Sequence, residues 1–190
     1  MGEWINNEAE VIEFIHRGFC DIYSSSNWLT SQVQIGQASL NDEERDSLWS
    51  KVTDEEIKIG LWLMKANKAP GSDGLHAGFF QLFWPIMGES VIQEVKHIFA
   101  SRKILEYLNR TYIELIPKIQ EPKTLGNYRP ISLCNIVYKI VTKIIVGRLR
   151  PYLEKLVSPL QLAFVPSRKG IDNTIIVQEF IHLICRKRAL

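Results

Sequence analysis

The spacing of hydrophobic residues in this chain predicts a mostly helical protein. In segments near 7–23, 91–99 and 137–149, apolar residues recur every three or four positions, the period that places them on one face of a helix. We expect these faces to form the core. The residues assigned to them are Val11, Ile12, Ile15, Phe19, Ile22 and Tyr23, then Val91, Ile92, Val95, Ile98 and Phe99, then Val137, Ile140, Val141, Ile144, Ile145 and Leu149.

Two shorter helices, near 42–50 and 54–66, are predicted from the residues that precede them. Asn41 is followed three residues later by an acid, and so is Thr53, which is the pattern of a capping box with Glu44 and Glu56. The acidic runs DEER and DEE therefore occupy first helical turns, where negative charge favours the helix dipole. This position explains the two runs better than a role as catalytic carboxylates does.

A strand pair is expected at Thr111 to Pro117 and Arg129 to Leu133, on either side of a loop that contains Gly and Pro. Two β-prone runs around such a loop predict an antiparallel hairpin. Lys118, Lys123 and Arg129 give this hairpin a positive charge that a simple turn does not require.

The two ends of the chain differ in character. Near the N-terminus, the uncharged run SSSNWLTSQVQIGQAS has no sustained period, which indicates an irregular linker and a boundary between two parts of the chain. Near the C-terminus, a final helix is predicted from about 173 to 186, with Asp172 as its cap.

Charge divides the chain more sharply than the net value of +2 suggests. Residues 1–95 hold 6 Lys and Arg against 15 Asp and Glu, whereas residues 96–190 hold 17 against 6. The basic second half favours contact with a polyanion, whose phosphates release counterions on binding. Solvated helix surfaces carry the same residues, so charge alone leaves both interpretations open.

Several classes of protein do not fit the sequence. No run of eighteen apolar residues exists, and the start MGEWINNEAEVIEF lacks a signal pattern, so we expect no membrane span and an intracellular protein, nuclear or cytoplasmic and not secreted. The Cys and His residues lack the spacing of metal ligands, so no metal site is predicted.

The run NKAPGSDG places Lys68 before a turn of Pro, Gly, Asp and Gly, and an aromatic helix is expected to begin near His76. The lysine and the amides of residues 71–74 offer donors to a phosphate, because glycine lets a ligand approach and a helix start exposes free N–H groups. A simple turn that binds no phosphate also explains these residues. The aromatic residues predicted to enter the core, rather than to stack on bases, are Phe79, Phe80, Phe83 and Trp84.

Three runs stand in order along the chain: NKAPGSDGLHAGFFQLFW, LIPKIQEPKTLGNYRPISLCNIVYKIVTKIIVGRLRPYL and SPLQLAFVPSRKGIDNTIIVQEFIH. Together they resemble the reverse transcriptase of plant non-LTR retrotransposons, the long interspersed elements. The resemblance implies an N-terminal helix and variable connector over 1–50 and a partial reverse transcriptase domain over 51–190. It implies a fragment that ends before the first catalytic Asp strand of the palm.

The resemblance also implies which residues meet the substrates. Lys118 and Arg129 match the positions that reach the triphosphate of the incoming nucleotide, and a planar guanidinium and a mobile ammonium both suit phosphate oxygens. Ser72 stands where the family usually has Pro, which is expected to loosen the turn somewhat. The positions implied to bind template and primer are Lys68, Gly71, Gly74, Arg168 and Lys169.

The catalytic carboxylates of the family have no counterpart in this sequence. In the complete family enzyme, Asp residues of the palm hold the Mg²⁺ ions that assist nucleotidyl transfer. This chain has no Asp-Asp pair, and residues 96–190 contain one Asp, Asp172. We therefore assign no catalytic residue, metal ligand or cofactor to this chain, and we expect it to be inactive alone.

The expected fold class is α+β: the mostly helical N-terminal and fingers portion of a right-hand polymerase, with a small antiparallel strand pair, an incomplete palm and no thumb. The expected partners are an RNA template, a DNA primer and deoxynucleotides, and the oligomeric state is left open. Without the palm, we expect uncovered apolar side chains at Val141, Ile144 and Ile145. The alternatives are a stand-alone basic nucleic-acid-binding module and a degenerate product without function.

Overall fold

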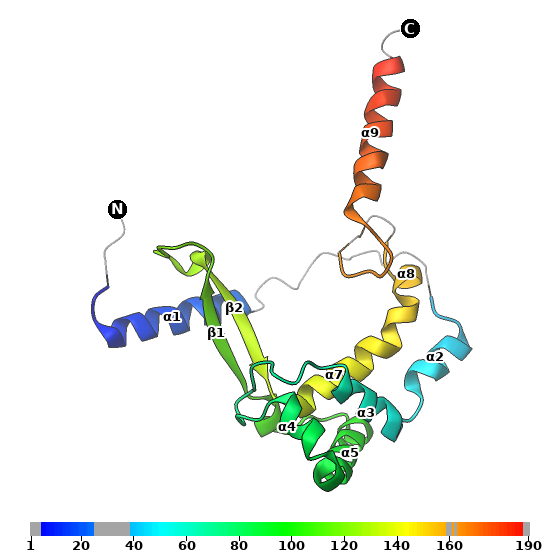
Figure 1. Cartoon of the computed structure of the whole chain (residues 1–190). Coiled ribbons are helices and arrows are strands. Elements are labelled where there is room, and N and C mark those ends of the chain that lie inside the picture. The colour runs from blue at the N-terminus through cyan, green and yellow to red at the C-terminus, as the bar shows by residue number, and fades with distance from the viewer. Residues whose placement is uncertain (1–4, 25–38, 159–160, 162, 188–190) are drawn as a thin grey trace. The chain divides into compact units, whose positions relative to one another are not determined.

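The computed structural model of the chain describes residues 5–24, 39–158, 161 and 163–187. These residues divide into two compact units (Figure 1). The hairpin unit comprises Met1–Gln34 and Thr111–Leu133, and the helical unit comprises Ile35–Arg110 and Cys134–Leu190. The predicted irregular linker lies almost entirely outside the described residues. The predicted boundary at residue 50 concerns sequence relationship and stays a prediction.

The hairpin unit contains α1 (Glu8–Tyr23), β1 (Thr111–Pro117), the 3₁₀ turn η1 (Leu125–Asn127) and β2 (Tyr128–Cys134). The two strands form one antiparallel sheet, and most of their residues are exposed. The predicted hairpin and the α+β class are confirmed. Two strands alone are only marginally stable in water.

Helix α1 is confirmed, but most of its predicted core face is not buried. Asn7 caps the helix, with its side-chain oxygen accepting from the Ala9 amide at 2.9 Å. Of the apolar residues whose side chains are described, Phe19 is buried, whereas Ile12 and Tyr23 are exposed. Helix α1 therefore contributes little to a core.

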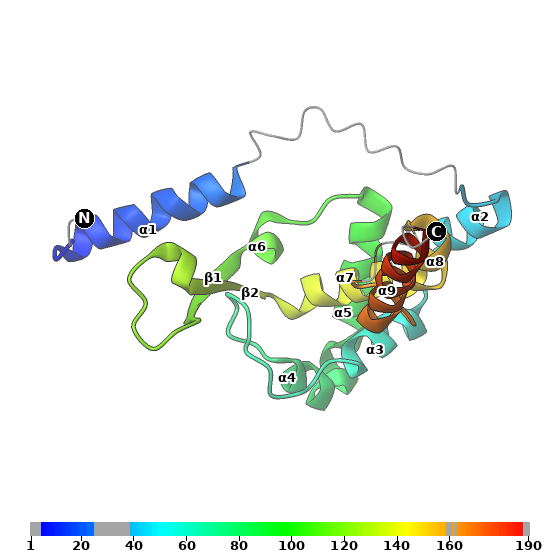
Figure 2. The ribbon, with the colours of Figure 1, turned by 90° about the horizontal axis from the view of Figure 1, so that it is seen from above.

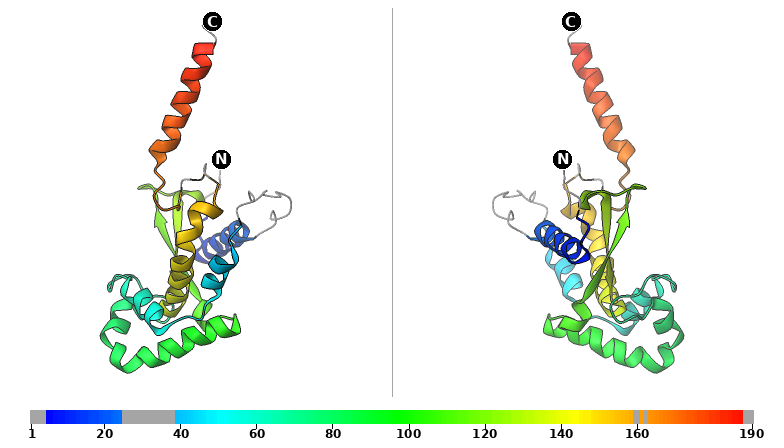
Figure 3. Two further views of the ribbon diagram at one scale, coloured as in Figure 1. Left: turned by 90° about the vertical axis from the view of Figure 1, so that its right-hand side faces the viewer. Right: turned by 90° about the vertical axis from the view of Figure 1, so that its left-hand side faces the viewer.

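The helical unit is organised around α7, which contacts α2, α3, α5 and α6 (Figures 2 and 3). Its elements are α2 (Asp42–Trp49), α3 (Asp54–Trp62), α4 (Ala77–Leu82), α5 (Trp84–Ser101), α6 (Glu106–Asn109), α7 (Ile136–Leu149), the 3₁₀ turn η2 (Arg150–Tyr152), α8 (Leu153–Leu156) and α9 (Gly170–Lys187). No helix within the described ranges is both long and apolar enough to cross a membrane.

The core lies in this unit, where α3, α5 and α7 bury their apolar faces against one another. Phe80 of α4 is buried in it, and Phe79 and Trp84 pack partly against it, whereas Phe83 is exposed. The predicted aromatic core is thus confirmed for Phe80 and wrong for Phe83. The side chains buried most completely include Ile57, Leu61, Val95, Ile136 and Ile140.

Helix α7 is buried further along its length than the sequence analysis predicts. Val141 and Ile144 are buried, so the expectation that they are uncovered is wrong. The physical reason is that α3 and α5 already pack against this side of α7. Ile145 is uncovered as expected, and Leu149, predicted for the core face, is also exposed.

Two helix ends differ from their predicted positions. Helix α3 ends at Trp62 rather than near 66, and the Gln81 side-chain amide donates to the carbonyls of Leu61 and Met64 at 3.1 and 3.0 Å. These carbonyls are therefore satisfied without a further helical turn. Helix α9 begins at Gly170, so Asp172 lies in its first turn and is not its cap.

Both predicted capping boxes are confirmed. In α2, the Asn41 side chain accepts from the Glu44 amide at 2.7 Å while the Glu44 carboxylate accepts from the Asn41 amide at 2.8 Å. The same carboxylate accepts from Lys155 Nζ at 2.7 Å, which lowers the pKa of Glu44 below its ordinary value. The first-turn position of the acidic runs is therefore confirmed.

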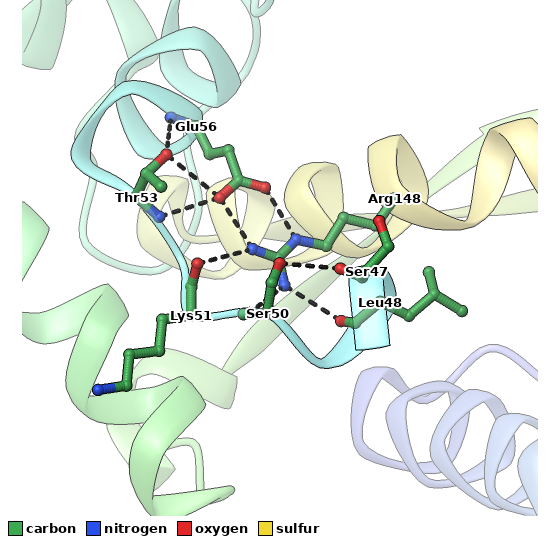
Figure 4. A network of polar contacts seen from close by, with 7 residues as sticks. All are labelled: Ser47, Leu48, Ser50, Lys51, Thr53, Glu56 and Arg148. Atoms are coloured by element: carbon green, nitrogen blue, oxygen red, sulfur yellow. Dashed lines mark hydrogen bonds and ion pairs between the residues drawn. The ribbon is translucent and has the colours of Figure 1, made fainter. Parts of the chain in front are cut away.

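One arginine joins α7 to the N-terminal part of the helical unit (Figure 4). The Arg148 guanidinium donates from Nε and Nη2 to the two carboxylate oxygens of Glu56, each at 2.8 Å. It also donates to the backbone carbonyls of Leu48, Ser50 and Lys51 at 3.1, 2.6 and 3.2 Å. All five N–H donors of a side chain that is 14% exposed thus have an acceptor. This cluster holds the end of α2 and the start of α3 against α7.

Glu56 serves this cluster and the cap of α3 together. Its carboxylate accepts from the Thr53 amide at 2.9 Å, and its own amide donates to Thr53 Oγ1 at 3.2 Å. The hydrogen bond from Arg148 is the largest influence on the carboxylate, and it lowers the pKa of Glu56 from 4.5 to about 2 although partial burial acts in the opposite direction.

A buried amide fixes the turn that precedes α4. Asn135 directly follows β2 and is 2% exposed, the one buried polar side chain in the described part of the chain. Its Oδ1 accepts from Ser72 Oγ at 3.2 Å and from the Asp73 amide at 3.3 Å, and its Nδ2 donates to the Tyr107 carbonyl at 3.0 Å. One side chain therefore connects the turn, α6 and the start of α7.

The lowered pKa of Glu56 predicts a loss of stability in acid. The folded protein binds this proton less readily than the unfolded chain, so the contribution of Glu56 is complete above about pH 4.5 and is lost as the pH falls toward about 2. We expect Glu56→Gln to unfold at a lower urea concentration than the unmodified protein at pH 7. This difference in urea concentration should shrink as the pH falls from about 4.5 to about 2. Glu55→Gln, an exposed neighbour, is the control. A difference independent of pH would contradict the role of the ion pair.

The packing around Asn135 predicts that the turn does not accept a side chain at Gly71. A Cβ atom there would overlap backbone and side-chain atoms of Asn135 and would lie 2.6 Å from the Cys134 carbonyl carbon. Gly71→Ala should therefore lower the free energy of unfolding in urea by about 1–3 kcal/mol. The control is Gly147→Ala in α7, where no atom lies within 4 Å and alanine should stabilise the helix by about 0.5–1 kcal/mol. Equal stability of Gly71→Ala and the unmodified protein would contradict this packing.

Candidate nucleotide and nucleic-acid contacts

Lys118 directly follows β1 and is tied to the loop of the hairpin. Its backbone amide donates to the Asn127 carbonyl at 2.7 Å, and its Nζ donates to the Gly126 carbonyl at 2.8 Å. The Asn127 side-chain oxygen accepts from the Thr124 amide and hydroxyl at 3.1 and 3.0 Å, which folds the loop back on itself. Because an ammonium group has three N–H donors, the Lys118 contact with Gly126 leaves two for another acceptor.

Arg129 is exposed and is the second residue of β2. It lies two positions after Asn127, the residue whose carbonyl meets Lys118, so the hairpin places both basic residues at one end of the strand pair. A guanidinium and an ammonium at one end of a hairpin can meet different oxygens of one polyphosphate.

The turn that contains Lys68, Gly71 and Gly74 is closed by its own hydrogen bonds. The Gly74 amide donates to the Gly71 carbonyl at 3.2 Å, and Gly74 adopts a left-handed φ of 71° that favours glycine. The Asp73 amide is already donated to Asn135. Two of the amides proposed to meet a phosphate are therefore occupied within the protein. Lys68 is exposed, and α7 reaches the same segment through Lys139 Nζ, which donates to the Ala69 carbonyl at 3.3 Å.

Ser72 is hydrogen-bonded within this part of the fold. Its hydroxyl lies 3.2 Å from Asn135 Oδ1 and 3.5 Å from the Arg110 carbonyl, two acceptors that a proline could not reach with a donor. Whether the serine loosens the turn relative to a proline stays a prediction.

Arg168 lies in the segment before α9, and its guanidinium already has backbone acceptors. It donates to the carbonyls of Ser158 and Gln161 at 2.5 and 2.7 Å, and to those of Glu154 and Val157 at 3.1 Å each. These contacts use four of its five donors, so its observed role is to organise the segment after α8. Its assignment to template or primer, and that of the adjacent Lys169, stays a prediction.

The donor set does not fit a divalent metal ion. Among the described residues, no three His, Cys, Asp or Glu side chains come together. Mg²⁺ binding in polymerases requires converging carboxylate oxygens, which these residues do not supply.

Asn135 is the residue of this region that sequence reasoning missed. It precedes α7 at the cap position, where an Asn normally accepts from the helix, yet its side chain makes no cap hydrogen bond. Its position between a strand and a helix was the available signal. The partners of its amide lie at least 28 residues away and leave no local pattern.

Comparison with known proteins places part of the chain in a family. Residues 116–188 match the family described as reverse transcriptase (RNA-dependent DNA polymerase), a range that contains Lys118, Arg129, Arg168 and Lys169. An uncharacterised 149 kDa protein of transposon TX1 from Xenopus laevis is 32% identical over 151 residues. The alignment covers 80% of this chain but 12% of that protein, so the chain spans about an eighth of the length of its relative. Residues 116–188 are therefore similar to a reverse transcriptase domain, and the chain is homologous to a segment of a transposon protein.

Proposed function

We propose that this chain is the fingers-bearing part of an RNA-directed DNA polymerase from a non-LTR retrotransposon. The observation that carries the proposal is the reverse transcriptase match over residues 116–188, which begins within β1 and includes the whole loop of the basic hairpin. The transposon relative supports a mobile-element source. The assignment to a plant long interspersed element rests on the motif resemblance alone.

In this proposal the hairpin holds the triphosphate of an incoming deoxynucleotide while an RNA template and a DNA primer lie beside it. Arg129 provides the planar fork for phosphate oxygens, and Lys118 provides the two N–H donors that its contact with Gly126 leaves. The loop hydrogen bonds of Asn127 hold Lys118 in place before a nucleotide arrives, which lowers the entropic cost of binding.

The proposal limits this chain to the phosphate-binding part of the reaction. In the complete family enzyme, Mg²⁺ ions held by Asp residues stabilise the charge that develops during nucleotidyl transfer. The six Asp residues of this sequence include no adjacent pair, and the described residues offer no cluster of metal ligands. We infer that the chain alone does not catalyse polymerisation.

A primer-extension assay tests this inference. The purified chain is incubated with a primed RNA template, deoxynucleotides and either Mg²⁺ or Mn²⁺, beside an active reverse transcriptase on the same template. We expect no extension above the buffer control, because the carboxylates that position the metal ions are missing. Extension that depends on the chain would show that other residues supply the metal site, and the inference would be wrong.

A second candidate function is a stand-alone module that binds nucleic acid. The observation that favours it is the excess of 17 Lys and Arg over 6 Asp and Glu in residues 96–190, which includes the exposed hairpin. Attraction of this kind acts on the phosphate backbone, so it requires no catalytic partner and little sequence preference.

The second candidate predicts that Arg129 contributes to binding of single-stranded RNA. The affinity for a fluorescent oligouridine should fall steeply with salt concentration, and Arg129→Ala should reduce the slope of log affinity against log salt by about 1. Lys58→Ala, in the acidic half of the chain, is the control and should leave the slope unchanged. An unchanged slope for Arg129→Ala would remove Arg129 from the interface, and absent binding at about 50 mM salt would refute the second candidate.

A further inference from the structure

Trp49, the last residue of α2, is 74% exposed. Helix α2 buries none of its residues, so the indole takes no part in the core of the helical unit. Tryptophan offers a large apolar surface that proteins normally cover or use for binding. An exposed indole on an otherwise polar helix therefore requires an explanation.

The backbone on both sides of this tryptophan is held in place. Arg148 donates to the carbonyl of Leu48 before it and to those of Ser50 and Lys51 after it (Figure 4). Ser50 Oγ also donates to the Ser47 carbonyl at 2.8 Å. The main chain at Trp49 is thus fixed by contacts that the indole does not make, and little backbone entropy would be lost when the ring meets a ligand.

One face of the indole is backed by a cation. The guanidinium carbon of Arg102 lies 5.4 Å from the centre of the ring, within the range of a cation–π contact. Arg102 follows α5 with a left-handed φ of 56°, an uncommon conformation for a residue other than glycine. Because the indole remains 74% exposed with this contact in place, its other face is open to solvent.

The charges that lie near Trp49 and Arg102 in sequence are mixed. The exposed Lys51 and Lys103 follow Trp49 and Arg102 closely in sequence. Two acidic residues of α2 already have partners, since Asp42 pairs with Arg45 at 3.1 Å and Glu44 pairs with Lys155. Glu43 and Asp46 of the same helix are also exposed and oppose a phosphate, so we expect stacking to contribute more than charge.

We propose that Trp49, backed by Arg102, is a stacking site for an unpaired base of single-stranded RNA. The proposal rests on the nucleic-acid binding inferred above and adds a contact outside the matched residues 116–188. Every base has a π-face that can lie on the open side of the indole, and its phosphate can approach the basic side chains that follow Trp49 and Arg102. The site accordingly adds affinity without selecting a sequence.

The test compares Trp49→Ala with Leu82→Ala, a control that removes an equally exposed apolar side chain, also 74%, from α4. Binding is measured with a fluorescent oligouridine of about 16 nucleotides over a series of salt concentrations. Trp49→Ala should weaken binding about tenfold at each salt concentration with an unchanged salt slope, because an uncharged ring releases no counterions. Leu82→Ala should stay within about twofold of the unmodified protein, as expected for an exposed residue outside the site.

Tryptophan fluorescence gives a second readout that a structural role would not change. Stacking of a base should quench part of the emission of the unmodified protein, and Trp49→Phe should lose this quenching while it retains an aromatic ring and most of the affinity. If Trp49→Ala binds as tightly as Leu82→Ala, or if Trp49→Phe shows the same quenching, the stacking site is refuted while nucleic-acid binding stands. If the unmodified protein binds no RNA, the stacking site and the stand-alone nucleic-acid-binding module are both wrong.

Discussion

A guanidinium cannot lose its charge in a protein, so an arginine that is largely removed from water must find an acceptor for every N–H group. Arg148 meets this requirement with one carboxylate and three backbone carbonyls. The arrangement of the helical unit depends on that requirement. Helix α2 buries no side chain of its own, and the carbonyl of Leu48 within it and those of Ser50 and Lys51 after it accept hydrogen bonds from this group. Glu56 sits at the same point because its own cap places the carboxylate there.

Local features of the fold could be predicted, because their causes are a few residues apart. The caps of α2 and α3, both strands and the period of α7 follow from hydrogen bonds and side-chain spacing within single segments. The failures have distant causes. Where α3 ends, the carbonyls of Leu61 and Met64 accept from Gln81, 17–20 residues further on, and Val141 is covered because α3 and α5 pack over it. No local pattern records either contact.

The candidate site was predictable to a similar extent. The motifs placed Lys118 and Arg129 on a hairpin, and the structure adds that loop hydrogen bonds position the lysine. Charge and motif together did not reveal that Arg168 donates to four carbonyls, or that the Ser72 hydroxyl donates to Asn135. The sequence identifies a basic residue in a motif, but it does not show whether its N–H donors bind a ligand or the protein's own backbone carbonyls. Only the structure shows which N–H donors remain available for a ligand.

The distance in sequence between Arg148 and its acceptors sets an order of events during synthesis. The carbonyls that it binds come from residues made 97–100 positions earlier, and the hairpin, whose strands are joined by a short loop, is made between them. Contacts between residues close in sequence form faster than contacts between distant ones, so we expect the hairpin to form before α2 contacts Arg148. Until residue 148 leaves the ribosome, α2 lacks the guanidinium that donates hydrogen bonds to the carbonyls at its end, although Arg102 is already available to Trp49. The Arg148 cluster of the helical unit is therefore completed late, by a residue that lies near the end of α7.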